Sequence, residues 1–178
     1  MKIAVVDIET TGFNPRDDCL VEIGIVELDL ETGEKRVLFD QIVREDHYTE
    51  EHANSWVFSN SDLTHEEVMA ASPLDFETVQ DILIKYSATA YNKKFDFGFL
   101  EYRGFVINSL LCPMIVATDV CRIPGRFGGN KWPTVTEAYN FLFGDDSYVE
   151  KHRGIEDAMD EADIVYELYK LGHYKIRE

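Results

Sequence analysis

Residues 2–12 read KIAVVDIETTG, an apolar run that ends in two acids and a glycine turn. A short apolar run bounded by turn residues is typical of a strand buried on both faces, so we expect a strand over residues 2–8. Because side chains alternate along a strand, Asp7 and Glu9 point to the same face. Two carboxylates side by side at the end of an apolar strand repel each other, and a bound divalent cation removes that conflict. Oxygen ligands of this kind select Mg²⁺ or Mn²⁺.

The composition of the whole chain limits what such a site can do. The chain has 178 residues, with 17 Lys or Arg against 34 Asp or Glu, and its net charge is −17. This length is typical of one domain, which we expect over residues 1–178. The charge excludes a generally basic surface for nucleic acid, so a metal or a small basic cluster must hold any polyanion. Three sparse cysteines and the lack of an apolar run of ~20 residues predict a soluble, cytoplasmic protein with no membrane partner.

Hydrophobic periodicity and turn residues predict the remaining elements. We expect strands at 19–28, 36–43 and 87–91, a strand–helix pair within 113–123, a loop at 124–130, and helices within 45–84 and at 94–103, 134–143 and 155–171. Strands followed by alternating helices and strands predict an α/β protein, with one mixed sheet and helices on both faces.

A second acid, Asp96, follows the strand expected at 87–91. Phe95 and Phe99 lie four residues apart, so they share one helix face and anchor that helix to the core. Asp96 then falls in the first turn, where the helix dipole favours a negative charge. The alternatives are a carboxylate that only stabilises the helix start, or one that serves a site at the carboxyl ends of the strands.

The last candidates are His152 and Asp157. Five residues apart on one helix they would be about 140° apart, so they converge only if His152 lies on the loop before the helix. A histidine with a pKa near neutrality can take a proton from an attacking water. The alternative is an exposed histidine beside an aspartate that caps the helix.

Together these segments resemble the DnaQ-like 3′–5′ exonucleases of the DEDDh class. The matching motifs are DIETTGF at 7–13, NKKFDFGFL at 92–100 and HRGIEDA at 152–158, and the resemblance covers about residues 2–171. It implies an RNase H-like fold with a mixed five-stranded sheet. It also implies metal-dependent hydrolysis of single-stranded nucleic acid from the 3′ end, with DNA favoured and nucleoside 5′-monophosphates released.

The resemblance also implies roles for individual residues. Two divalent cations, Mg²⁺ or Mn²⁺, would be the cofactors, and Asp7 would bridge them. Glu9 and Asp157 would hold the ion that carries the attacking water, and Asp96 would serve the other. His152 would be the general base.

Substrate contacts follow from the same resemblance. Thr10, Thr11, Gly12 and Phe13 would meet the terminal nucleotide, with the Phe13 ring stacked on its base, although Thr10 has the alternative role of shaping the turn. The residues expected to line the adjacent channel are Asn92 and Phe95. Two positions depart from the family pattern: Tyr91 replaces a common His, and Gly154 replaces a common Ala and is expected to loosen His152.

Other functions stay open at this stage. The chain could instead be an exoribonuclease that trims RNA, or a catalytically silent domain that binds nucleic acid or protein. Residues 45–84 contain ten acids and no Lys or Arg, so this acidic face could dock a basic partner protein. The oligomeric state is open.

Several further side chains have two interpretations. Trp56 and Trp132 are expected in the core, with base stacking as the alternative. The basic residues contact phosphates or form a solvated face: Lys93, Lys94, Arg122, Arg126, Lys131, Lys151 and Arg153.

Overall fold

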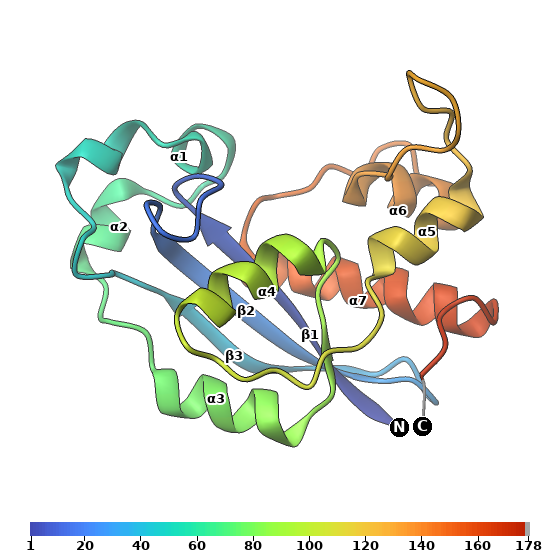
Figure 1. Ribbon diagram of the computed structural model, residues 1–178, viewed down its shortest axis with the longest axis horizontal. Helices are drawn as coiled ribbons and strands as arrows, with labels where there is room; N and C mark the ends of the chain where they lie inside the picture. Colours follow the sequence, from blue (N-terminus) through green and yellow to red (C-terminus); the bar gives the residue numbers. More distant parts are fainter. Residues whose placement is uncertain (177–178) are drawn as a thin grey trace.

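A mixed sheet forms the centre of the computed structural model, which describes residues 1–176 (Figure 1). Within these residues four strands pair in the order β3-β2-β1-β4. They are β1 (Lys2–Thr10), β2 (Leu20–Asp29), β3 (Lys35–Ile42) and β4 (Ala88–Thr89). Because β1 runs antiparallel to β2 and parallel to β4, it occupies the interior of the sheet.

Helices cover both faces of this sheet, as expected for the RNase H-like fold (Figure 1). They are α1 (Trp56–Asn60), α2 (His65–Ala70), α3 (Phe76–Lys85), α4 (Lys93–Tyr102), α5 (Pro113–Cys121), α6 (Val135–Phe143) and α7 (Gly154–Lys170), with a short 3-10 helix at Glu50–Asn54. None of the helices in the described part of the chain is long and apolar enough to cross a membrane.

The apolar run of β1 is explained by two separate cores. Ile3 and Val5 are fully buried against side chains of α5, α6 and α7. Ala4 and Val6 point the other way and are fully buried against α3 and α4. Each buried large aliphatic side chain contributes about 1.5–3 kcal/mol. The register of β1 is therefore fixed on both faces, and so is the position of the acids at its end.

The expectation of a fifth strand is wrong. Ser109 makes one isolated parallel bridge to Ala88, and the chain then enters α5 directly. Pro113 occupies the first turn of α5, where its missing N–H costs nothing and its fixed φ favours the helix. The strand expected within 113–123 is therefore absent, because residues 113–121 form this helix.

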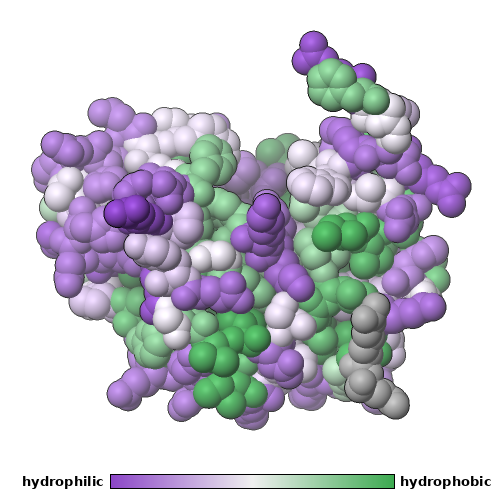
Figure 2. Space-filling view, viewed as in Figure 1, coloured by the Kyte–Doolittle hydropathy of each residue, from purple (hydrophilic) through white to green (hydrophobic). Residues whose placement is uncertain are grey.

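Two segments flank the carboxyl end of β1. Helices α1 and α2 stand on one side, and the loop between α5 and α6 projects on the other (Figure 1). The space-filling view shows the surface hollowed between them (Figure 2).

Candidate active site

The end of β1 brings two carboxylates into a cavity of about 370 Å³. Glu9 is only 9% exposed. The Oδ2 atom of Asp7 is buried and has no hydrogen-bond partner within the described residues. Asp7 lies opposite Gly24 of β2, so it has no cross-strand side chain as a partner, and the start of α7 packs over that glycine. An unpartnered buried carboxylate oxygen is costly, which indicates that a ligand belongs there.

Helix α4 supplies the third carboxylate. Asp96 lies in its first turn, as expected, and is 4% exposed. The rings of Phe95 and Phe99 lie 5.0 Å apart, and Phe99 is buried in the core below the sheet. This packing fixes the rotation of α4 and directs Asp96 into the cavity that Asp7 and Glu9 line.

The segment before α7 supplies the histidine and the last carboxylate. His152 lies on the loop and has a φ of 55°, a left-handed backbone conformation that is uncommon for a residue with a side chain. Asp157 lies in the first turn and accepts hydrogen bonds from the backbone N–H groups of Lys151 and Arg153, at 3.2 and 3.1 Å. The expected position of His152 on the loop before α7, which lets it approach Asp157, is therefore confirmed.

Arg153 anchors this loop instead of facing a substrate. Its guanidinium donates to both carboxylate oxygens of buried Glu22 on β2, at 2.8 and 3.0 Å, and it also pairs with Asp62. Glu22 accepts a third hydrogen bond from the backbone N–H of Gly154 at 3.0 Å. Arg153 matches neither of its two interpretations, phosphate contact or a solvated face, because Glu22 and Asp62 already pair with its guanidinium.

The expectation that Gly154 loosens this loop is wrong. A Cβ at this position would lie 2.9 Å from the Gly24 nitrogen, and a Cβ on Gly24 would lie 2.3 Å from the Gly154 carbonyl carbon. The two glycines therefore let α7 approach β2 closely, which fixes the start of α7.

These elements converge on one constellation. Ligating atoms of Glu9, His152 and Asp157 all lie within 4.8 Å of one another. Asp7, Asp96 and His152 line the same cavity. All five residues singled out from the sequence thus come together, from β1, α4 and the start of α7.

Burial dominates the electrostatics of this constellation. It raises the pKa of Glu9 to about 9, of Asp96 to about 8 and of Asp157 to about 6, and it raises the pKa of Asp7 well above its usual range. The neighbouring carboxylates add to the shift of Asp7 by repulsion. Burial lowers the pKa of His152, which keeps its ring neutral and able to accept a proton.

The donor set fits divalent cations. Clustered carboxylates that resist ionising together are stabilised by a cation held between them, and hard oxygen ligands suit Mg²⁺ or Mn²⁺. The buried Oδ2 atom of Asp7, which has no hydrogen-bond partner, also indicates a cation at this position.

Sequence reasoning missed two acids in the cavity. Glu161 is 3% exposed, lines the cavity and accepts a hydrogen bond from the Tyr91 N–H at 3.1 Å. Burial raises its pKa well above the usual range. Glu150 also lines the cavity, and burial raises its pKa to about 7. Glu161 lies four residues after Asp157, so the helical repeat could have placed both on one face.

Both tryptophans contradict the expected core positions. Trp56 is 58% exposed and Trp132 is 65% exposed. The Trp56 ring meets the His152 ring edge-on, with centroids 4.7 Å apart, and it lines the cavity. It therefore covers the histidine from the α1 side.

The residues expected to meet substrate all line the cavity: Thr10, Thr11, Gly12, Phe13, Asn92 and Phe95. Two of the side chains also shape the turn. The Thr10 hydroxyl donates to the Gly12 carbonyl at 2.6 Å, and the Thr11 hydroxyl accepts from the Cys19 N–H at 2.8 Å. Phe13 is 89% exposed, so its ring is free to stack on a base.

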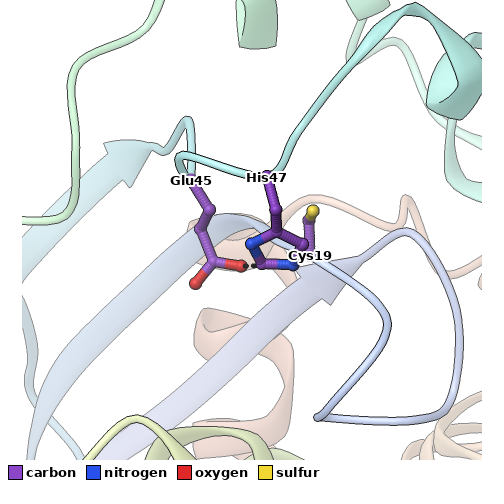
Figure 3. Close-up of side chains that lie close together, drawn as sticks. All are labelled: Cys19, Glu45 and His47. Carbon is purple, nitrogen blue, oxygen red and sulfur yellow. Dashed lines mark ion pairs between the residues drawn. The ribbon is translucent and has the colours of Figure 1, made fainter.

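A second group of metal-ligand residue types lies outside this cavity. Cys19, Glu45 and His47 approach within 4.8 Å (Figure 3). Both oxygens of Glu45 accept hydrogen bonds from Arg103, and one also accepts from the Leu20 N–H. Burial raises the pKa of Cys19 to about 12. Because the thiol is protonated and the carboxylate is already paired, neither is available as a metal ligand. The group instead forms a structural link between the end of α4 and the start of β2.

The family model RNase_T, described as an exonuclease, matches residues 4–165. None of the curated proteins matches the chain in sequence.

Solved structures share the fold at low identity. A full-length 3′-exonuclease is 18% identical with a TM-score of 0.70, and the match covers 97% of this chain and 62% of that one. The nuclease domain of 3′hExo, a DEDDh family member bound to rAMP, is 21% identical with a TM-score of 0.64 and coverages of 99% and 96%. E. coli exonuclease I in complex with a dT13 oligonucleotide is 15% identical, with a TM-score of 0.65 and coverages of 97% and 43%.

This chain therefore spans less than two thirds of the full-length 3′-exonuclease and less than half of E. coli exonuclease I. The family match covers nearly all of the strands and helices that build the constellation. The chain belongs to the RNase_T exonuclease family.

Proposed function

We propose that this chain removes nucleotides from the 3′ ends of single-stranded nucleic acid, with DNA favoured, and releases nucleoside 5′-monophosphates. The observation that carries the proposal is the meeting of Asp7, Glu9 and Asp96 in one cavity, with the Asp7 Oδ2 atom buried and unpartnered. Its opening lies beside exposed Phe13, which suits a chain end with an unpaired base.

The proposed roles follow from position. Asp7, Glu9, Asp96 and Asp157 would hold two divalent cations, Mg²⁺ or Mn²⁺. Such a pair, when bound, stabilises both the entering and the leaving oxygen of an in-line displacement at phosphorus. Their positive charge also offsets the repulsion between a polyanion and a chain of net charge −17.

His152 is proposed to act as the general base. The lowered pKa leaves an imidazole nitrogen unprotonated, and that nitrogen takes the proton of the water that attacks the phosphodiester. The edge-on Trp56 ring restricts how far the imidazole can rotate. The oxygen that leaves is the 3′ oxygen of the preceding nucleotide, so the product carries a 5′-phosphate.

Matched 5′-labelled single-stranded DNA and RNA, incubated with Mg²⁺ or Mn²⁺, test the proposal. We expect a ladder that shortens from the 3′ end and disappears with a chelator or with Asp7→Asn. Asp81→Asn, an exposed acid on α3, is the matched control and should leave the ladder intact. Faster loss of RNA would assign the substrate to the exoribonuclease alternative. Folded protein that gives no ladder with either polymer would overturn the proposal and leave the silent binding domain.

A further inference from the structure

A second cavity, of about 480 Å³, adjoins the first along α4. Asn92 lines both cavities, so they meet at the start of this helix. The walls of the second cavity include Lys93 and Lys94 on α4, Ile115 on α5, and Trp132 after the loop between α5 and α6. A strand whose terminal nucleotide occupies the first cavity has this second one directly beside it.

The chemistry of this cavity suits a single strand. Trp132 is 65% exposed and presents a large flat ring. Lys94 is exposed and takes part in none of the ion pairs among residues 1–176, whereas the Lys93 ammonium is held by the Leu110 carbonyl at 2.5 Å. A stacking platform next to a free cation is the combination that binds bases and phosphates without regard to sequence. One acid, Glu101, also lines this cavity.

The adjoining loop extends the same chemistry. We call residues 122–131 the basic hairpin, because an antiparallel bridge joins Pro124 to Asn130. Residues 120–136 contain three basic side chains and no acid, although one of the three, Lys131, pairs with Glu137 on α6 at 2.5 Å. At the tip, Phe127 is 94% exposed and lies 5.6 Å from the Arg126 guanidinium. The hairpin stands clear of the rest of the surface (Figure 2).

Charge selects the side of the cleft along which a strand leaves. The α1 and α2 side belongs to residues 45–84, which have ten acids and no Lys or Arg. A polyanion is repelled from that side and attracted to the basic hairpin. The charge distribution and the two adjoining cavities, which share Asn92, therefore indicate one path.

We propose that the second cavity and the basic hairpin bind the nucleotides that precede the 3′-terminal one, with Trp132 stacking on a base and Lys94 contacting a phosphate. This inference rests on the proposed function, since it takes the terminal nucleotide to occupy the first cavity. The occupant is single-stranded nucleic acid, and it is recognised by its backbone and by unpaired bases.

Two measurements on Trp132→Ala and Lys94→Ala test the inference. The first is kcat/KM for oligothymidylates of 2, 4, 8 and 12 nucleotides with Mg²⁺. We expect loss on the order of 10-fold for the 8- and 12-mers through KM, and a smaller loss for the dinucleotide, which offers these groups only one nucleotide before the terminal one. The second is anisotropy of labelled dT12 and rU12 with Ca²⁺, which does not depend on turnover. Here Lys94→Ala should reduce the slope of log affinity against log salt by about 0.7.

The controls are Tyr102→Ala and Lys85→Ala, an exposed aromatic and an exposed cation that line neither cavity. Equal loss at every length would mean that Trp132 only supports the fold, and this outcome overturns the inference. Unchanged affinity together with a changed sedimentation coefficient of the free protein also overturns it, in favour of contact between two copies. If wild-type protein cleaves nothing but dT12 affinity still falls in Trp132→Ala, the proposed function fails while the binding path stands.

Discussion

At the scale of single residues, the site depends on groups that solvent cannot reach. Asp96 and Asp157 are 4% and 1% exposed, and burial raises the pKa of both. A buried carboxylate is a poor stabiliser of the fold because burying its charge costs free energy, and the two backbone N–H groups that donate to Asp157 leave its pKa raised. These positions are therefore best explained by the ions that they would hold.

His152→Ala should reduce kcat by about 10²–10⁴-fold, the usual contribution of a positioned general base. In wild-type protein, burial lowers the His152 pKa from 6.5, so the loss of activity on acidification should have its midpoint below pH 6.5. That acidic limb should disappear in the variant. Steady-state kinetics over pH 5–9 measure both, with exposed His173 changed to Ala as the control. An unchanged limb in His152→Ala would assign it to a carboxylate.

Glu161→Gln should weaken the response to Mg²⁺. The glutamine oxygen can still accept the hydrogen bond from the Tyr91 N–H, so the fold keeps its contact while the cavity loses a charge. We expect the half-saturating Mg²⁺ concentration to rise roughly 10-fold, as for other groups that support metal ligands. Titration of activity with Mg²⁺ checks this, and Glu156→Gln, on the outer face of α7, is the control. An unchanged Mg²⁺ response would limit Glu161 to a structural role.

At the scale of elements, the sequence predicted those that carry long periodic patterns. β1, α4 and α7 follow from their apolar repeats, and the turn between β2 and β3 follows from its polar residues and glycine. The absence of a fifth strand could not be predicted from the sequence, because the β-branched residues at 113–123 fit a strand as well as a buried helix. The contribution of Glu161 was hidden because α7 carries many acids, and tertiary packing alone decides which of them face the cavity.

Gly24→Ala should damage the fold and the site together. Its Cβ would lie 2.3 Å from the Gly154 carbonyl carbon, so α7 must move away from β2. We expect destabilisation of about 1–3 kcal/mol, as for overpacked sites, and loss of activity through displaced His152 and Asp157. Gly98→Ala on α4 is the matched control. Its Cβ meets nothing within 4 Å, so it should stabilise the protein by about 0.4–1 kcal/mol.

Urea unfolding and activity assays on the two glycine variants provide the measurement. Equal stability of the two variants would mean that α7 can tilt without cost, and that the close approach to β2 does not fix the site.

At the scale of the whole molecule, acidic and basic residues are distributed unevenly over the surface, and the composition alone does not show this. The total of −17 argues against nucleic acid, yet residues 45–84 have only acids among their Asp, Glu, Lys and Arg side chains, whereas the basic hairpin has only bases. Sequence reasoning identified the basic cluster and the acidic segment, but it could not place them on opposite sides of one cleft. Docking of a basic partner protein on residues 45–84 stays a prediction.

Without metal, the protein should lose stability as pH rises. The folded pKa values of Glu9 and Asp96 are raised to about 9 and about 8, so the folded state binds more protons than the unfolded state from about pH 4 upward. The free energy of unfolding then falls with rising pH across this window. We expect Tm in a chelator to drop on the order of 10 °C between pH 6 and 8.5.

Excess Mg²⁺ or Mn²⁺ should restore the lost stability at pH 8.5, since binding to the folded state stabilises it by mass action. Asp7→Asn removes one buried charge and should flatten the pH dependence in chelator while abolishing activity. Calorimetry at four pH values provides the test. A Tm that rises with pH in wild-type protein would contradict the raised pKa values of the buried carboxylates.

The basic hairpin also has a consequence for proteolysis. Trypsin cuts after Lys and Arg, and exposed loop tips are the preferred places for a first cut in a native protein. Residues 45–84 offer no such bond, whereas Arg122, Arg126 and Lys131 are exposed on a projecting loop. Brief digestion should therefore split the chain first at the hairpin, into fragments ending near residue 126. The rate at which these fragments form would then report, without any activity assay, when the hairpin is covered.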